Sequence, residues 1–296
     1  MFEKIQLYMI YLLGRFIKGD VEKDKKYLKI LYKFIMKKEC DFDSPKTYNE
    51  KLQYLKLYNR NPLYTKLVDK FEVKEYVKKI IGEEYIIPTL GVWDSFDEIN
   101  FEELPEQFVL KCTHDSGGLV IVTDKSKFDK KKAKRKIEHC LKRNYFYNNR
   151  EWPYKDIKPR IIAEKYMVDE SGYELKDYKF FCFDGKAKSM FIATDRSADT
   201  ETCFDFYDMD FNHLPFTNGH PNATKLINKP DKFEEMIKIS ELLSKDLIHA
   251  RVDLYNINGK IYFGEITFFH WSGLVPFVPE EWDYKFGEWI QLPKEK

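Results

Sequence analysis

The 296-residue sequence has few cysteines and histidines, and neither type is arranged as in a disulfide framework or a metal site. The five cysteines are odd in number and form no Cys-x-x-Cys pair, which favours a reduced, cytoplasmic protein over a disulfide-rich or zinc-binding one. The six histidines are scattered without His-x-x-x-His spacing. Internal repeats and low-complexity segments are also absent from the sequence.

An excess of charge of either sign is missing too. The 50 Lys and Arg residues nearly balance the 49 Asp and Glu residues, so the formal net charge is +1. Bulk binding to nucleic acid would need a basic excess, and we therefore expect no nucleic-acid partner. Aromatic residues are abundant instead. The 24 Phe and 20 Tyr contribute to a hydrophobic fraction of 43%, which indicates a globular protein with thick apolar cores and surfaces on which sugars or bases can stack.

A hydrophobic run long enough to cross a membrane is not found at the N-terminal end. The apolar stretch at residues 7–13 is too short, and it lacks a small-residue cleavage site. One face of a helix over residues 1–18 would carry six apolar side chains: Phe2, Ile5, Met9, Leu12, Leu13 and Phe16. We expect this face to dock on the protein's own body. The alternative is a weak contact with the membrane surface, at its inner face.

Hydrophobic spacing predicts helices at residues 20–38, 47–59, 67–80, 96–104, 128–145 and 233–249. Thr47 is a suitable N-cap for the second, with Glu50 as its capping-box partner, and Gly82 closes the third. The helix at 128–145 is strongly basic; we interpret it first as a solvated face and second as a site for an anionic polymer. Residues 195–213 are rich in Asp and predict irregular structure.

Residues 108–122 follow the pattern strand, glycine turn, strand. Lys111 lies at the end of the first strand, and Ser116, Gly117 and Gly118 form the turn. A Walker loop or a dinucleotide fingerprint needs a helix after its glycines, so neither is present. Phosphates bound here would lie under a hairpin loop that donates backbone N–H groups, with Lys111 as a fixed positive charge. An ordinary hairpin whose lysine reaches solvent is the alternative.

A second hairpin is predicted at residues 248–273, because two alternating apolar runs flank Asn258-Gly259. Period-2 alternation places Arg251 and Asp253 on one face of the first strand, and Phe263, Glu265 and Thr267 on one face of the second strand. If the turn brings these two faces into register, the hairpin carries two carboxylates and an arginine side by side. Two neighbouring carboxylates repel unless a cation lies between them, and Mg²⁺ typically takes one or two carboxylates plus substrate phosphates. An exposed hairpin with solvated charges is the alternative.

In their order and spacing, these segments resemble the ATP-grasp superfamily of ligases over residues 67–273. That family has, in order, a strand ending in lysine, a glycine loop, a strand leading to a Glu-containing adenine hinge, an Arg-x-Asp strand and a Glu-x-Asn strand. In the same order, the matching positions are Lys111, residues 116–118, residues 164–167, Arg251 with Asp253, and Glu265 with Thr267. More narrowly, Asp69-Lys70, residues 85–91, Asp177-Tyr178-Lys179 and Glu265-Ile266-Thr267 look like the branch named for the teichuronopeptide biosynthesis protein TupA, which is associated with bacterial cell-surface polysaccharide synthesis. Thr267 departs from the Asn of many ATP-grasp enzymes, and a hydroxyl is a weaker metal ligand.

The resemblance implies roles for three groups of residues. Those implied to contact ATP are Lys70, Lys111, Ser116, Gly117, Gly118, Glu164, Lys165, Met167, Asp177 and Phe263. Those implied to bind Mg²⁺ are Asp253, Glu265 and Thr267. Those implied to act on the reacting group are Arg251 and Lys179. Within the first group, Lys111 would hold phosphate oxygens, Asp177 would lie at the ribose and Phe263 would pack on the adenine.

The implied fold is α+β: an ATP-grasp fold, in which two α+β subdomains clasp ATP, with a helical N-terminal region. The implied boundaries are residues 1–62 for the helical region, 63–105 for a segment that precedes the ATP-grasp fold, 106–166 for the nucleotide-binding subdomain and 167–296 for the C-terminal subdomain with the metal site. Such a ligase transfers the γ-phosphoryl of ATP to a substrate carboxylate and joins the acyl phosphate to an amine or similar nucleophile. A uronic acid and an amino acid are the pair of substrates to suspect.

Two other functions stay open. Asp208-Met209-Asp210 is an Asp-x-Asp tripeptide of the kind that can hold a metal and a sugar nucleotide in a glycosyltransferase. A non-catalytic polysaccharide-binding scaffold would explain the many aromatic residues and Thr267, but not the presence together of Lys111, Arg251, Asp253 and Glu265. Nucleotide specificity separates the three functions: ATP with Mg²⁺, a sugar nucleotide, or neither.

Overall fold

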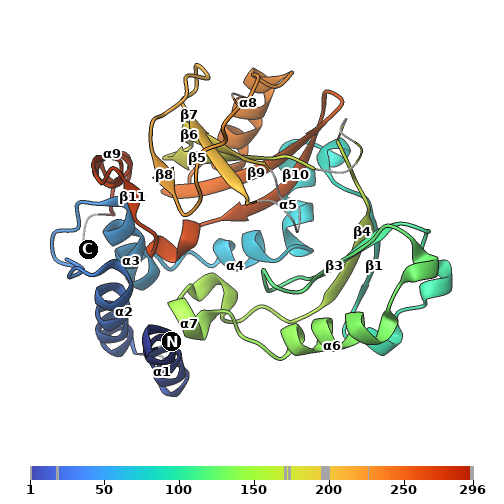
Figure 1. The fold of residues 1–296 in the computed structure, drawn as a ribbon, viewed down its shortest axis with the longest axis horizontal. Helices are drawn as coiled ribbons and strands as arrows, with labels where there is room; N and C mark the ends of the chain where they lie inside the picture. The colour runs from blue at the N-terminus through green and yellow to red at the C-terminus, as the bar shows by residue number, and fades with distance from the viewer. Residues whose placement is uncertain are drawn as a thin grey trace.

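The computed structural model describes residues 2–17, 20–169, 172, 175–194, 201–225 and 227–293. Two antiparallel sheets dominate these residues, one in the upper half of Figure 1 and the other at the lower right. The four-stranded sheet contains, in spatial order, β1 (Thr89–Trp93), β4 (Ile161–Lys165), β2 (Phe108–Cys112) and β3 (Leu119–Val122). The five-stranded sheet contains β10 (Lys260–Thr267), β9 (His249–Ile257), β5 (Asp177–Phe183), β6 (Lys186–Thr194) and β7 (Cys203–Tyr207). A short third sheet pairs β11 (Phe277–Val278) with β8 (Thr217–Asn218).

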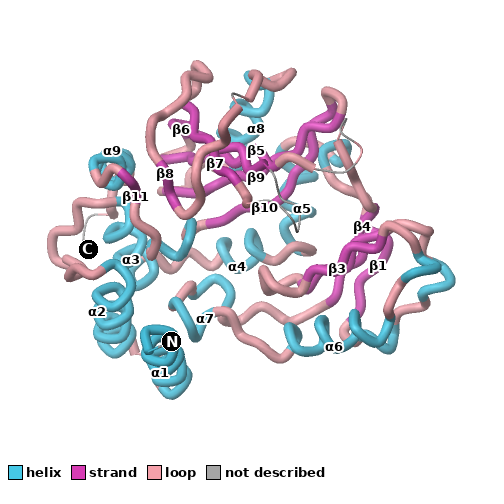
Figure 2. The backbone as a smooth tube through the Cα atoms, viewed as in Figure 1, coloured by secondary structure: helices cyan, strands magenta, loops and turns pink. Residues whose placement is uncertain are grey.

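Helices surround and connect these sheets. The α-helices are α1 (Phe2–Phe16), α2 (Val21–Met36), α3 (Tyr48–Tyr58), α4 (Leu63–Val68), α5 (Glu72–Ile80), α6 (Lys130–Leu141), α7 (Phe146–Asn149), α8 (Phe233–Leu243) and α9 (Glu281–Trp289). The 3₁₀ turns are η1 (Glu83–Tyr85), η2 (Phe96–Glu98), η3 (Phe101–Glu103), η4 (Lys125–Lys127), η5 (Trp152–Tyr154) and η6 (His270–Gly273). Figure 2 shows α1, α2 and α3 gathered at one end of the molecule, with the four-stranded sheet at the opposite end.

The four-stranded sheet has one apolar face and one polar face. In β2, Phe108, Leu110 and Cys112 are buried in a core that includes Ile137 of α6, whereas Lys111 alternates with them and faces the other way. The lysines of α6 are mostly exposed, which agrees with their interpretation as a solvated face. Because α6 covers the apolar face, the opposite face is free to carry polar groups.

The five-stranded sheet follows the same logic. Val252 and Leu254 of β9 are fully buried in a core to which α8 contributes, and Arg251 and Asp253 alternate with them on the opposite face. α3 belongs to this core as well, because Tyr48 is fully buried there and contacts Nε2 of His249 through its hydroxyl at 3.0 Å. The predicted capping box at the start of α3 is confirmed: Glu50 N donates to Thr47, and the Glu50 side chain accepts in return.

The prediction for the apolar face of α1 is wrong. Its six apolar side chains, from Phe2 to Phe16, are 41–75% exposed. The helix packs on the body through its other side, with Leu7 and Ile10 partly buried and Gly14 buried. Gly14 permits this close approach, since a Cβ there would lie 2.7 Å from the backbone oxygen of Tyr147. In the part of the chain that the structure describes, no helix is long and apolar enough to cross a membrane.

Two predicted elements are divided in the structure. The helix expected at 67–80 is α4 and α5 with a break between them, because Oδ1 of Asp69 accepts hydrogen bonds from the backbone nitrogens of Phe71 and Glu72 and so begins a new helix. This break places Lys70 in a turn. The helix expected at 96–104 is instead the two short turns η2 and η3.

Three other predictions need correction at their boundaries. The helix expected at 233–249 ends at Leu243, and the one expected at 128–145 is the shorter α6. The segment 195–213 is not irregular throughout, because β7 pairs there with β6; residues 195–200 lie outside the described residues. β1 also joins the four-stranded sheet from within the segment at 63–105, and the proposed subdomain boundaries stay a prediction.

Candidate functional site

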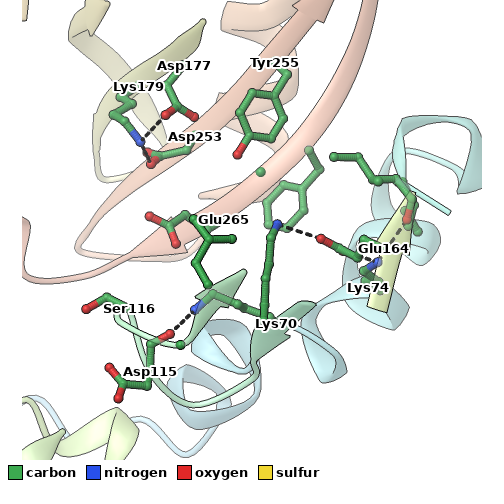
Figure 3. Close-up of a pocket in the computed structure, with 17 residues that line it drawn as sticks. Lys70, Lys74, Asp115, Ser116, Glu164, Asp177, Lys179, Asp253, Tyr255 and Glu265 are labelled. Carbon is green, nitrogen blue, oxygen red and sulfur yellow. Dashed lines mark hydrogen bonds and ion pairs between the residues drawn. The ribbon is translucent and has the colours of Figure 1, made fainter. Parts of the chain in front are cut away.

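A cavity of about 200 Å³ lies between the two large sheets (Figure 3). Its lining residues are Lys70, Lys74, Ile86 and Ile87 before β1; Lys111, Asp115, Ser116, Gly118, Leu119 and Glu164 from the four-stranded sheet and its loop; and Asp177, Lys179, Asp253, Tyr255, Phe263, Gly264 and Glu265 from the five-stranded sheet. Four lysines and five carboxylates therefore meet in one cavity wall. Such a concentration of opposite charges is typical of a functional site.

The hairpin of β9 and β10 contains a β-bulge that aligns its two carboxylates. Regular pairing continued from the turn would place Glu265 opposite Val252, which is fully buried on the core face. The register instead shifts before Glu265, which lies opposite Asp253. Gly264 at this shift has no room for a side chain, because a Cβ would lie 2.9 Å from the backbone oxygen of Asp253. The predicted hairpin is confirmed, but the bulge that brings Glu265 to Asp253 is invisible to period-2 counting.

Arg251 lies at the centre of this face and binds both carboxylates. Its Nε and Nη2 donate to the two oxygens of Asp253 over 2.7 and 2.8 Å, and Nη2 also donates to Oε1 of Glu265 over 3.2 Å. The remaining nitrogen, Nη1, lies 2.7 Å from Nδ1 of His270. A guanidinium only donates, so Nδ1 accepts and Nε2–H of His270 donates to Oδ1 of Asn218 at 3.0 Å. His270 thus orients Arg251, and burial beside that cation lowers the pKa of His270 well below its ordinary value.

Lys179 is a second cation on the same face. It forms an ion pair with Asp253, and its Nζ lies 3.6 Å from Oδ2 of Asp177. Burial raises the pKa of Asp253, although Arg251 and Lys179 both oppose this shift. Glu265 differs, because its side chain is 42% exposed to the cavity. Burial would raise its pKa too, but Lys179, Lys70 and Arg251 outweigh that effect and hold the pKa of Glu265 well below its usual range.

This donor set suits a hard cation only as part of a larger set of ligands. Within the described residues, no group of three or more His, Cys, Asp and Glu is arranged to hold a metal ion. Asp253 and Glu265 supply two carboxylates, and Oγ1 of Thr267 already accepts from Arg251 at 3.2 Å. Mg²⁺ typically binds through one or two carboxylates and completes its shell with water and substrate phosphates. The residues therefore fit a Mg²⁺ that binds together with a nucleotide, and they do not fit a metal held by the protein alone.

On the opposite wall, Glu164 is held between two lysines. Its Oε2 lies 2.6 Å from Nζ of Lys111 and its Oε1 lies 2.5 Å from Nζ of Lys74. Burial opposes ionisation of this carboxylate, but the two ammonium groups prevail and lower its pKa. Lys74 also donates to the carbonyl oxygen of Ile87 at 2.9 Å and to the hydroxyl of Thr89 at 2.7 Å. Lys74 is therefore fixed by several groups, whereas Lys111 is fixed chiefly by Glu164.

The glycine loop after β2 is organised by the buried Asp115. Its Oδ1 accepts from the backbone nitrogen of Gly117 at 3.0 Å, and its Oδ2 accepts from Nε of Arg143 at 2.8 Å. The backbone oxygen of Asp115 accepts from Nζ of Lys70 at 2.9 Å. These bonds hold the loop at the cavity with Ser116 on its exposed side, as Figure 3 shows.

Sequence reasoning missed several cavity residues: Lys74, Ile86, Ile87, Asp115, Leu119, Tyr255 and Gly264. Tyr255 follows Asp253 at period 2 on β9, so the alternation that identified Asp253 would also have found it. Lys74 follows Lys70 by four residues, a weaker signal. Nothing in the sequence around Asp115 marks its side chain as the group that fixes the loop.

Other residues named from the sequence do not line the cavity. The side chain of Lys165 is exposed, and its backbone nitrogen donates to the oxygen of Pro88 at 3.0 Å. Met167 follows in the loop after β4, and Thr267 lies beside Arg251. Gly117 belongs to the loop but not to the wall of the cavity. Arg251 is buried behind Asp253 and Glu265 and is not among the lining residues either. The roles of all the site residues named from the sequence stay predictions.

The Asp-x-Asp tripeptide also lies outside the cavity wall. The carboxylate of Asp208 accepts from the backbone nitrogens of Asp210 and Asn212 at 3.0 and 2.8 Å, and from the Asn212 side chain at 3.0 Å. Asp208 therefore shapes the turn after β7, a role that needs no metal.

In the comparison with known proteins, the model of the family described as TupA-like ATPgrasp matches residues 50–291, which is most of the chain. No curated protein matches significantly. Among solved structures, D-alanine–D-alanine ligase from Bacillus anthracis is 19% identical with a TM-score of 0.42, over 69% of this chain and 57% of that one. The Helicobacter pylori enzyme is 15% identical with a TM-score of 0.44, over 85% and 68%. The L-amino acid ligase from Bacillus licheniformis is 13% identical with a TM-score of 0.46, over 84% and 56%.

The chain thus spans a little over half the length of the Bacillus anthracis ligase. Similarity at this level carries no argument about substrate or activity.

Proposed function

The chain belongs to the TupA-like ATP-grasp family, and from this membership we propose that it is an ATP-dependent ligase that joins a carboxylate to an amine or a similar nucleophile. The observation that carries the proposal is the arrangement of charge in the cavity. Lys111 pairs with Glu164 of the four-stranded sheet and Lys70 binds its glycine loop, whereas Asp253, Glu265 and Lys179 belong to the five-stranded sheet. A nucleotide triphosphate with Mg²⁺ needs this combination of ammonium groups and carboxylates in one place.

The lysines would serve the phosphates by exchanging partners. Three of the four cavity lysines would do this, and each now binds an oxygen of the protein: Lys111 binds Glu164, Lys70 binds the backbone of Asp115, and Lys179 binds Asp253. Phosphate oxygens would take over these hydrogen bonds, and the exposed turn would add backbone N–H groups. The apolar part of the cavity wall would accept the adenine ring, and its residues are Ile86, Ile87, Leu119 and Phe263.

Asp253 and Glu265 would hold the Mg²⁺ that accompanies ATP. When bound, the ion neutralises charge that develops on the phosphates. Lys179 lies on the same face and would contact the transferring phosphoryl group. In the first step, an oxygen of the substrate carboxylate attacks the γ-phosphorus and ADP leaves, which gives an acyl phosphate. In the second step, the amine attacks the acyl carbon, inorganic phosphate leaves, and the amine gives up a proton.

Arg251 would stabilise the negative charge that develops on the acyl oxygen in the second step. It is suited to this task because His270, Asp253 and Glu265 fix its guanidinium from three sides. A preorganised donor of this kind contributes more than a mobile one, since it does not have to reorient as the charge forms.

We further propose that the reaction belongs to the assembly or decoration of a bacterial surface polysaccharide, with a uronic acid and an amino acid as the substrates. The support for this part is the namesake of the family, and the cavity itself does not select the carboxylate. The numerous aromatic side chains are consistent with a sugar substrate.

The proposal is tested by nucleotide specificity. Thermal shift should detect ATP in the presence of Mg²⁺, with a smaller shift when the metal is removed, and no shift with a UDP-sugar. Product formation by mass spectrometry should then require ATP. A glycoside made from a UDP-sugar without ATP would overturn the proposal.

A pair of variants separates the ligase from a glycosyltransferase. Arg251→Ala should retain ATP binding and lose amide product, because an oxyanion contact strengthens only as charge develops. The double variant Asp208→Asn with Asp210→Asn should leave ATP turnover nearly unchanged, since Asp208 only shapes a turn. The reverse pattern would favour the glycosyltransferase.

A further inference from the structure

Helix α1 carries two apolar faces, of which only one is covered. Leu7 and Ile10 meet the core of α2 and its neighbours, together with the buried Gly14. The second face is exposed to the outside, and its side chains are Phe2, Ile5, Tyr8, Met9, Leu12, Leu13 and Phe16. At about 100° per residue, six of these seven side chains, all but Tyr8, fall within a stripe of roughly 100°. A stripe of this width normally faces a core, so its exposure indicates a docking surface.

The net charge of the segment that contains α1 and α2 indicates what docks on this face. Residues 1–38 contain ten Lys and Arg residues and four Asp and Glu residues, so their net charge is +6; the other 258 residues carry a net charge of −5. The described lysines of this segment are largely exposed, among them Lys4, Lys26 and Lys29. A second copy of the chain would bring two surfaces of equal positive charge together, which is unfavourable. An apolar layer that lies beneath a negatively charged surface would match both the exposed apolar side chains of α1 and the positive charge of the segment.

Helix α1 is held rigidly on the body. The guanidinium of the buried Arg150 donates to the backbone oxygen of Gly14 at 2.7 Å, to Oδ1 of Asp24 at 2.5 Å and to the backbone oxygen of Tyr147 at 2.6 Å. These bonds join α1, α2 and α7. Tyr27 adds a hydrogen bond from its hydroxyl to the backbone oxygen of Asn148 at 2.6 Å. Docking through α1 would therefore orient the whole molecule, because the helix cannot swing on a loose linker.

We propose that α1 docks this protein on an anionic membrane surface. The exposed Phe, Leu, Ile and Met side chains enter the boundary between headgroups and acyl chains, and exposed lysines of the same segment bind lipid phosphates. With 15 residues, α1 is shorter than the roughly 20 residues that span a bilayer, so it lies in the plane of the surface. This surface is at one end of the molecule, as Figure 1 shows, and the inference does not depend on the proposed ligase activity.

The full chain is tested by co-sedimentation with vesicles. Vesicles of equal parts phosphatidylcholine and phosphatidylglycerol should sediment the protein, phosphatidylcholine vesicles should do so much less, and added salt should weaken the binding. The double variant Met9→Gln with Phe16→Gln should bind the anionic vesicles at least about tenfold more weakly than the wild type does. Both side chains are exposed, at 62% and 75%, so the melting temperature should not change.

A matched control removes two exposed apolar side chains elsewhere. Ile121 on β3 and Leu242 on α8 are 56% and 50% exposed, and Ile121→Gln with Leu242→Gln should bind vesicles as the wild type does. Equal binding of the two double variants would overturn the proposal, and so would equal binding to charged and uncharged vesicles. The proposal would also be overturned if sedimentation gave the Met9/Phe16 variant a lower molecular mass than the wild type, because a second copy would then cover the face.

Discussion

Two lysines bind the same carboxylate, yet they should respond differently to substitution. Lys111 and Lys74 both form ion pairs with Glu164, at 2.6 and 2.5 Å. Lys74 also donates to Ile87 and Thr89, whereas the described hydrogen bond of the Lys111 ammonium is the one to Glu164. The ammonium group of Lys111 can therefore move to a phosphate and lose only its hydrogen bond to Glu164. We predict that Lys111→Met mainly weakens ATP binding and that Lys74→Met mainly weakens the fold.

The size of each effect follows from the contacts. A hydrogen bond to a charged group contributes about 1.5–3 kcal/mol, so Lys111→Met should raise the Kd of ATP roughly 10- to 150-fold. Glu164 keeps Lys74 in this variant, and the loss of stability should stay below the roughly 3–5 kcal/mol of a buried charge left without a partner. Lys74→Met instead also leaves the part-buried carbonyl oxygen of Ile87 without its donor, which should lower the free energy of unfolding more.

Calorimetry with ATP and with adenosine checks the first effect, and urea unfolding checks the second. Adenosine lacks the phosphates, so wild type and Lys111→Met should bind it about equally. If Lys111→Met loses adenosine and ATP to the same extent, Lys111 is a structural residue and the reasoning fails. It also fails if Lys74→Met reduces ATP affinity more than Lys111→Met does while unfolding as the wild type does.

Three further predictions concern the metal site, the bulge and a buried acid. Asp253→Asn and Glu265→Gln should each abolish ADP formation, a loss of several kcal/mol in transition-state stabilisation, with the circular dichroism unchanged; wild-type ADP release would contradict the metal assignment. Gly264→Ala should slow ADP formation about tenfold or more, because a Cβ there would lie 2.9 Å from the backbone oxygen of Asp253. The control on the same hairpin is Gly259→Asn, which should retain the wild-type rate because nothing lies within 4 Å of a Cβ at that position. Burial raises the pKa of Glu151 to about 7 from its ordinary 4.5, although Lys56 opposes this. The folded chain then keeps a proton on Glu151 that the unfolded chain has lost. The free energy of unfolding of the wild type should therefore fall relative to that of Glu151→Gln as pH rises from about 4.5 to about 7. A difference between the two free energies that does not change with pH would refute this prediction.

The sequence predicted those parts of the site that depend on local pattern. Alternation along β9 placed Arg251 and Asp253 on one face, and the Asn258-Gly259 turn set the hairpin that joins them to β10. The sequence also predicted the two strands and the turn around the glycine loop, and the capping box of α3. Each of these features is decided by residues that lie close together in the sequence.

Features that depend on tertiary structure were not predictable. The shift at Gly264 arises from how β10 pairs with β9, which no residue count along one strand contains. The break before α5 was missed for another reason: the Asp69 contacts to Phe71 and Glu72 are local, but the helical pattern continues through them and hides the break. Periodicity also showed that α1 has an apolar face, but it could not show that the body covers the opposite side.

The fate of oxygen in the substrate carboxylate tests the central claim most directly. The chain would be supplied with ATP, Mg²⁺, an amine and a uronic acid labelled with oxygen-18 in its carboxylate, and inorganic phosphate would be examined by mass spectrometry. Transfer of the γ-phosphoryl to that carboxylate predicts that one labelled oxygen leaves in the phosphate for each amide formed, and that Glu265→Gln yields neither product. Amide formed with unlabelled phosphate, or a product made without ATP, would contradict the account.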